Sequence, residues 1–191
     1  MSYGVLVEGP YDAPVYRELI RKITSARVEV FAREAGGVSG LMRLIRVTLR
    51  DLEHVMQGGP VDKALVIRDS GGREPQELEE AMQDRVGGAA LSFPRGIKVH
   101  AVRRAMETWL LADIDAINAV ATSRGGRQVA AVQGALEEIL DPKERLKRSL
   151  SEARLPYDPE VCRGIAERAR IETLRYRCPS FVSFERKVID C

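Results

Sequence analysis

Four short apolar runs alternate with longer segments of helical spacing, and this alternation limits the fold more than any other feature of the sequence. The runs are residues 3–7, 28–31, 64–67 and 97–102. Strands separated by helices are typical of βαβ units, whose strands run parallel. Residues 64–67 are uniformly apolar, which predicts a central strand, whereas residues 28–31 alternate with polar residues, which predicts a strand near the edge. We therefore predict an α/β fold with a Rossmann-like parallel sheet of about four strands flanked by helices.

The pattern changes beyond Asp113, where helical periodicity continues without a further strand. We expect an α/β core over residues 1–115 and a helical C-terminal extension over residues 116–191 that packs on this core. A chain of 191 residues is of ordinary length for one structural domain. Residues 103–113, after the fourth apolar run, are also predicted to be helical.

Composition and cysteine content narrow the classes of protein. The formal net charge of +2 is too small to indicate a nucleic-acid binder by itself. Cys162, Cys178 and Cys191 form no CxxC pair, which argues against both a disulfide framework and a zinc site. The sequence contains no secretory h-region and no apolar run long enough to span a membrane. We therefore expect a cytoplasmic protein with reduced thiols and no membrane partner.

Acidic residues follow two of the predicted strands. Glu8 and Gly9 come directly after the first apolar run, and Asp69 ends the third. Open parallel sheets bind ligands beyond the carboxyl ends of their strands, where these two carboxylates are expected to meet. Mg²⁺ takes oxygens from one or two carboxylates and keeps several waters. Two plainer interpretations stay open: a strand-end carboxylate also caps neighbouring helices, and residues 69–72 have the composition of an ordinary turn.

The two strand ends resemble motifs of the Toprim domain, which occurs in topoisomerases, primases and nucleases of the overcoming-lysogenization-defect type. Residues 5–9, with Asp12 close behind, resemble the first motif, and residues 64–69 resemble the second. Glu-Thr-Trp-Leu-Leu-Ala-Asp at residues 107–113 and Cys-Pro-Ser-Phe at residues 178–181 resemble a bacterial Toprim-like family known as a domain of unknown function. The likeness covers most of the chain and implies a Toprim-like fold.

The resemblance implies chemistry on phosphodiester bonds, in which Glu8 acts in proton transfer and Asp69 holds Mg²⁺ or Mn²⁺. The family has a second aspartate two positions after Asp69, where this sequence has Gly71. Glu107 and Asp113 lie six residues apart and do not share a helical face, so at most one of them points into the acidic site. We favour Glu107, because it lies nearer to the end of the fourth predicted strand.

The predicted catalytic and metal-binding residues are therefore Glu8, Asp69 and Glu107, and the weaker candidates are Asp12, Glu74 and Asp113. A phosphodiester substrate also needs positive charge close to the acidic site. Arginine makes bidentate contacts to phosphate that lysine cannot make. The predicted phosphate or nucleic-acid contacts are the arginines near the carboxyl edge, namely Arg68, Arg73, Arg103 and Arg104.

Three functions are consistent with these residues. The first is magnesium-dependent phosphodiester hydrolysis of nucleic acid by a nuclease, for which the resemblance suggests a role in phage defence or a mobile element. The second is a catalytically inactive module that binds nucleic acid or a nucleotide, which Gly71 favours. The third is an accessory subunit of an ATPase–nuclease system, since the chain contains no GxxxxGK[ST] motif of its own.

Overall fold

The structure is a computed structural model, and it describes residues 1–24, 29–34, 38–54, 61–87 and 91–190. The elements in chain order are β1 (Ser2–Val7), α1 (Asp12–Thr24), β2 (Glu29–Glu34), α2 (Val38–Glu53), β3 (Lys63–Asp69), α3 (Pro75–Val86), β4 (Ile97–Val102), α4 (Glu107–Leu110), α5 (Ile114–Ser123), η1 (Leu136–Glu138), α6 (Pro142–Glu152), α7 (Pro159–Arg168), α8 (Ile171–Arg177) and α9 (Pro179–Ile189).

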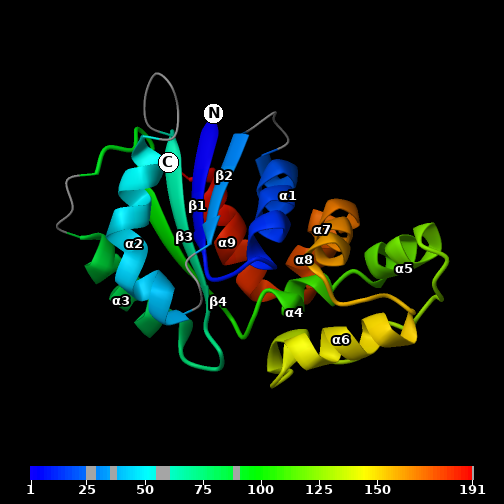
Figure 1. Cartoon of the computed structure of the whole chain (residues 1–191). Coiled ribbons are helices and arrows are strands. Elements are labelled where there is room, and N and C mark those ends of the chain that lie inside the picture. The colour runs from blue at the N-terminus through cyan, green and yellow to red at the C-terminus, as the bar shows by residue number, and fades with distance from the viewer. Residues whose placement is uncertain (25–28, 35–37, 55–60, 88–90, 191) are drawn as a thin grey trace.

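The strands form one parallel sheet in the order β2-β1-β3-β4 (Figure 1). The prediction of a parallel sheet flanked by helices is confirmed. β3 lies inside the sheet and β2 at its edge, as the uniform and the alternating apolar runs indicated. Val28, the first residue of the second apolar run, lies outside the described residues.

Helices cover both faces of the sheet (Figure 1). Successive side chains of a strand point to opposite faces. Leu6 and Val66 therefore join the buried cluster of α2 and α3, whereas Val5 and Leu65 join the cluster of α1 and α9. Burial on both sides explains why β1 and β3 are apolar throughout. None of the helices in the described ranges is both long and apolar enough to cross a membrane.

The segment after residue 115 shares the core of the sheet. The Tyr3 hydroxyl of β1 donates a hydrogen bond to the carbonyl of Val188 in α9 at 3.1 Å. The Trp109 ring lies with its centroid 5.1 Å from that of Phe181 and 5.1 Å from that of Phe184. The His100 ring of β4 also lies 6.0 Å from the Trp109 ring, so β4, α4 and α9 pack around one tryptophan and the C-terminal helices help to fix the position of α4.

The prediction of a continuous helix over residues 103–113 is wrong. Only Glu107–Leu110 form α4, because Arg104 adopts a φ of +67°, outside the right-handed helical region. Arg104 N–H donates to Ser70 Oγ at 2.9 Å, and its carbonyl accepts from Gly71 N–H at 3.0 Å. These bonds attach the loop after β4 to the loop after β3, and they bring the start of α4 next to the end of β3.

Candidate functional site

The order of the strands creates a crevice at their carboxyl ends. The chain leaves β1 outward to β2 and then returns past β1 to β3, so the connections that follow β1 and β2 lie on opposite faces of the sheet (Figure 1). Such a switch point is where open α/β sheets bind ligands. Glu8 follows β1 and Asp69 ends β3, so the topology alone brings both residues to this crevice.

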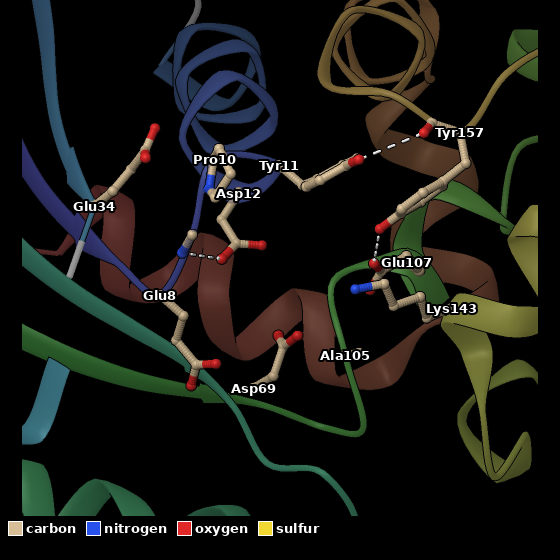
Figure 2. Close-up of a pocket in the computed structure, with 11 residues that line it drawn as sticks. Glu8, Pro10, Tyr11, Asp12, Glu34, Asp69, Ala105, Glu107, Lys143 and Tyr157 are labelled. Atoms are coloured by element: carbon tan, nitrogen blue, oxygen red, sulfur yellow. Dashed lines mark hydrogen bonds between the residues drawn. The ribbon is translucent and has the colours of Figure 1, made fainter. Parts of the chain in front are cut away.

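A cavity of about 460 Å³ opens at this switch point (Figure 2). Its lining joins the end of the sheet, the start of α1, the start of α4 and the segment around α6. The lining residues are Glu8, Gly9, Pro10, Tyr11, Asp12, Glu34, Asp69, Ala105, Glu107, Lys143 and Tyr157. The structure therefore brings together the three predicted catalytic residues and one weaker candidate, Asp12.

Asp69 has little compensation for its charge. Its Oδ1 accepts a hydrogen bond from Met106 N–H at 3.1 Å, and within the described ranges no arginine or lysine nitrogen lies within 4 Å of its carboxylate. Burial raises the pKa of Asp69 well above its ordinary value, and the charges of Asp12, Glu107 and Glu8 raise it further. A cation placed beside Asp69 would therefore favour its ionised form.

Asp12, the first residue of α1, lies beside this group. Its Oδ2 accepts a hydrogen bond from Gly9 N–H at 3.0 Å, which holds the carboxylate over the end of β1. Burial, together with the charges of Glu107 and Glu8, raises the pKa of Asp12 to about 7, although the bond from Gly9 acts in the opposite direction. Asp12 consequently exchanges its proton near neutral pH.

Glu8 faces the predicted phosphate contact Arg68. The Oε1 atom of Glu8 lies 3.3 Å from Nε of Arg68, but both atoms are buried without a hydrogen bond in the part of the chain that is described. Burial raises the pKa of Glu8, and the charge of Arg68 offsets only part of this effect. Arg68 is 8% exposed and does not line the cavity, so the structure places it against Glu8 and away from solvent.

Glu107 is fixed at the opposite wall by a tyrosine. The side chain is 5% exposed, and its Oε1 accepts a hydrogen bond from the Tyr157 hydroxyl at 2.5 Å. Tyr157 in turn stacks on Tyr11, with ring centroids 4.6 Å apart and planes inclined by 10°. Burial and this bond to Glu107 raise the pKa of Tyr157, so the hydroxyl keeps its proton and acts as the donor.

Lys143 supplies positive charge to the same cavity. It lies in the first turn of α6, and its Nζ is 5.8 Å from the ring centroid of Tyr11 and 5.7 Å from that of Tyr157. Within the described ranges no carboxylate oxygen lies within 4 Å of Nζ. The cavity thus has an acidic side at the strand ends and a lysine with two tyrosines on the other side (Figure 2).

The remaining acidic candidates lie elsewhere. Glu74 is exposed at the start of α3 and does not line the cavity. Asp113 is 1% exposed, accepts a hydrogen bond from Asp115 N–H at the start of α5, and forms an ion pair with Arg170 at 2.7 Å. Its hydrogen bonds from Arg170 lower the pKa of Asp113 despite burial. Asp113 therefore joins α5 to the start of α8.

The arginine candidates and Gly71 also lie outside the lining of the cavity. Arg73 and Arg103 are exposed, and Arg104 lies beside Gly72, where an added Cβ would be 2.8 Å from Nη1. Gly71 adopts a φ of +58°, and a Cβ at this position would meet no atom within 4 Å. The position at which the resemblance expects a second aspartate thus lies in open space.

The chemistry of the lining residues fits a hard, hydrated cation. The acidic groups offer only oxygen donors, and no histidine or cysteine is among the lining residues, which suits Mg²⁺ or Mn²⁺ better than Zn²⁺. Across the described ranges, no three carboxylate, histidine or cysteine groups lie close enough together to hold a metal ion jointly. The residues therefore fit an ion bound by one or two carboxylates, with waters as its other ligands.

Comparison with known proteins places the site within one family. The family model described as Domain of unknown function (DUF4276) matches residues 7–189, a range that includes both walls of the cavity. No curated protein and no solved structure matches the chain. The match begins at the last residue of β1 and extends over β2, β3, β4 and the C-terminal helices, so Glu8 and Lys143 lie within the same family unit.

Proposed function

We propose that this chain, which belongs to the family described as Domain of unknown function (DUF4276), is a Toprim-like, magnesium- or manganese-dependent enzyme that hydrolyses phosphodiester bonds in nucleic acid. One observation carries the proposal: Glu8, Asp12, Asp69 and Glu107 line one cavity at the topological switch point of the sheet. Arg68 and Lys143 are the only cations that the described residues bring to this group.

The excess of negative charge favours binding of a divalent cation. Burial raises the pKa of Glu8, of Asp12 and of Asp69, because each ionised carboxylate is poorly solvated in the crevice. Removing a carboxylate from water without a partner costs several kcal/mol. A hydrated Mg²⁺ held by Glu8 and Asp69 would offset this penalty. Glu8 follows β1 and Asp69 ends β3, so the rigid sheet fixes the spacing of the two residues.

The metal ion would stabilise the charge that develops on the phosphoryl oxygens and lower the pKa of a bound water. Glu8 and Asp69 would hold it, and Glu107 would lie across the cavity from them. The oxygen of a water molecule forms a bond to phosphorus while the bond from phosphorus to the leaving nucleoside oxygen breaks. A carboxylate accepts the proton of that water, and the leaving oxygen takes up a proton from solvent.

Asp12 is best suited to accept this proton. In the metal-free cavity its pKa is about 7, close to the pH at which a general base works well, and it is not one of the two proposed metal ligands. The resemblance assigns proton transfer to Glu8, but Glu8 lies 3.3 Å from Arg68, whose charge favours the ionised form of Glu8. We therefore assign metal binding to Glu8 and Asp69, and proton transfer to Asp12.

The Toprim-like part of the proposal rests on the strand ends and their order. Glu8-Gly9 after β1 and Asp69 after β3 resemble the family motifs, and these strands are neighbours in the sheet. Gly71 departs from the family pattern. A nucleic-acid partner follows from the proposed chemistry, whereas an ATPase partner and a role in phage defence rest on the resemblance alone.

A second candidate is a module that binds nucleic acid or a nucleotide without cutting it. Gly71 in place of an aspartate favours it, and so does the absence of a three-residue metal cluster across the described ranges. Both functions use the same cavity, so they are separated by turnover and not by the position of the ligand.

A cleavage assay with matched variants tests the proposal. The purified chain is incubated with single- and double-stranded DNA and RNA in Mg²⁺, in Mn²⁺ and in EDTA. We expect metal-dependent cleavage that Asp69→Asn and Glu8→Gln abolish and that Glu74→Gln leaves unchanged, because Glu74 is exposed and outside the cavity. Absence of cleavage by folded, metal-loaded protein would favour the binding module, and cleavage by Asp69→Asn at the wild-type rate would refute the site.

A further inference from the structure

One wall of the cavity is built by three segments that are distant in sequence. Tyr11 comes from the loop after β1, Lys143 from the first turn of α6, and Tyr157 from the loop before α7. The Tyr11 hydroxyl donates a hydrogen bond to the carbonyl of Tyr157 at 3.5 Å, and the two rings stack. Figure 2 shows this wall facing the carboxylates of Asp12 and Asp69 across the open space.

Lys143 is suited to bind an anion. Within the described part of the chain, its Nζ has no carboxylate oxygen within 4 Å, although five carboxylates line the same cavity. Lys147, one turn later in α6, also lies near the Tyr157 ring at 5.6 Å, but it is paired with Glu144 at 2.5 Å. An exposed ammonium at the rim of an acidic cavity, with its charge left free, fits a phosphate group.

The two tyrosines are suited to a nucleoside. Aromatic side chains stack on bases with little regard to sequence, since every base has a π-face. The Tyr11–Tyr157 pair is held by its own stacking and by the bond from Tyr157 to Glu107, so the wall is formed before a ligand arrives. One nucleotide contains both groups, a phosphate that would bind Lys143 and a nucleoside that would pack against the two tyrosines.

The dimensions of the cavity limit what reaches the carboxylates. A volume of about 460 Å³ is that of a small-molecule pocket and not of a channel. Glu107 is only 5% exposed, and Glu8, Asp12 and Asp69 are half-buried, so these four carboxylates are recessed from the surface. A stacked duplex is too wide and stiff to place a phosphodiester there, and enzymes that act in such pockets take a nucleotide from a single strand or flip it out of the helix.

We propose that the cavity takes one nucleotide of single-stranded nucleic acid, with its phosphate on Lys143 and its nucleoside against the Tyr11–Tyr157 pair. This assignment of the substrate class rests on the proposed function of the same site. Tyr157 acts as a positioning residue for Glu107, and Lys143 binds the substrate directly.

Binding of a cleavage-resistant probe tests the assignment. A fluorescent phosphorothioate oligonucleotide of about ten nucleotides is titrated with Mn²⁺-loaded protein, single-stranded or annealed to its complement. We expect the single strand to bind about tenfold more tightly than the duplex, and Lys143→Gln to weaken single-strand binding about tenfold. Arg148→Gln is the matched control, because it removes an exposed positive charge from the same helix at a residue outside the cavity lining, and we expect it to bind as the wild type does.

Two results would overturn the assignment: a duplex bound as tightly as the single strand, or equal losses for Lys143→Gln and Arg148→Gln. Lys143 is exposed and makes no ion pair in the described ranges, so its replacement is expected to leave the fold intact, which a thermal melt checks. Mn²⁺ binding is measured separately for each variant. Intact Mn²⁺ binding with no strand preference refutes this inference alone, whereas wild-type protein that binds no Mn²⁺ refutes the proposed function.

Discussion

Asp69 and Asp113 are two aspartates of one fold in opposite electrostatic surroundings. Asp113 accepts hydrogen bonds from Arg170 through the backbone N–H at 2.8 Å and through Nε at 2.9 Å and Nη2 at 2.7 Å. Asp69 accepts one from Met106 N–H at 3.1 Å and faces other carboxylates. The chain neutralises Asp113 with its own arginine, whereas no arginine or lysine of the described residues forms an ion pair with Asp69.

The pKa values of the two residues express this difference. Burial acts to raise both, but at Asp113 the hydrogen bonds and charge of Arg170 outweigh it and lower the pKa, whereas at Asp69 the neighbouring acids add to it. A lowered pKa marks a group that stabilises the folded chain when ionised, and a raised pKa marks one that destabilises it. We infer that Asp113 stabilises the fold and that Asp69 contributes to the candidate functional site.

The largest expected effect is on activity. Asp69→Asn keeps the shape of the side chain but removes the charge that would hold the metal ion, so we expect kcat/KM for cleavage to fall by about 100-fold or more. Asp113→Asn should retain wild-type kcat/KM at temperatures where the variant is folded. Equal losses of activity in the two variants would break the distinction between them.

For the free energy of unfolding, we expect the order of the two residues to be reversed: substitution of Asp113 should destabilise the chain more than substitution of Asp69. Asp113→Ala removes the N-cap of α5, which alone costs about 1 kcal/mol, and leaves Arg170 without its partner, so the free energy of unfolding should fall by at least that amount. Asp69→Asn removes a charge that lacks compensation, so without metal near pH 8 it should unfold at a higher urea concentration than the wild type. A destabilised Asp69→Asn variant would contradict our interpretation of Asp69.

Stabilisation by metal should depend on pH. A carboxyl group whose pKa is raised in the folded state stabilises the fold below its unfolded pKa, and that contribution is lost as pH rises through the folded value, about 7 for Asp12. The pKa values of the proposed metal ligands Glu8 and Asp69 are raised in the same way, and Mn²⁺ competes with protons for these two carboxylates, so it should raise the melting temperature more at about pH 8 than at about pH 5.5. Differential scanning fluorimetry measures this shift in melting temperature. Asp69→Asn is the control, and we expect Mn²⁺ to cause no shift in it.

A smaller effect is expected at the tyrosine that positions Glu107. Tyr157→Phe keeps the ring stack but removes the hydroxyl that donates to Glu107 at 2.5 Å. One hydrogen bond is worth about 1 kcal/mol, which predicts a decrease of about fivefold in kcat. Tyr11→Phe, which changes the same stack without touching Glu107, should lower kcat less. An identical decrease in both would show that the bond to Glu107 has no role.

The smallest effect is expected where the Toprim pattern is broken. Gly71→Asp restores the expected acidic residue, but a φ of +58° costs a residue with a Cβ about 1 kcal/mol. The new side chain would extend from a position with no atom within 4 Å of its Cβ, so we expect no gain in kcat and a slightly lower urea midpoint. A marked gain in metal affinity would show that this position reaches the site.

The sequence predicts the strand-end part of the site but not its opposite wall. Glu8 and Asp69 follow apolar runs, and parallel strands bring their carboxyl ends to one edge, so local patterns are sufficient to place them. Lys143 and Tyr157 reach the cavity only through the packing of α6 and of the loop before α7 against α4. Their sequence context indicates a helix start and a turn, and contains no sign of where these segments lie.

The errors of the sequence interpretation have physical causes in the same region. The helix over residues 103–113 fails because the loop after β4 is bonded to Ser70 and Gly71, which holds Arg104 in the left-handed region. Arg68 was expected to contact phosphate, but β3 directs it inward, toward Glu8. Neither contact is visible in a one-dimensional pattern, because each joins two strand ends that meet only in the folded sheet.

The most direct test of the difference between Asp69 and Asp113 is a calorimetric titration of Mn²⁺ into the wild-type chain, Asp69→Asn and Asp113→Asn at about pH 8, where Asp12 is ionised. We predict a single binding event in the wild type and in Asp113→Asn, and binding at least about tenfold weaker in Asp69→Asn. Folded wild-type protein that binds no Mn²⁺, or Asp69→Asn protein that binds it as tightly as the wild type, would contradict a metal site at the carboxyl ends of β1 and β3.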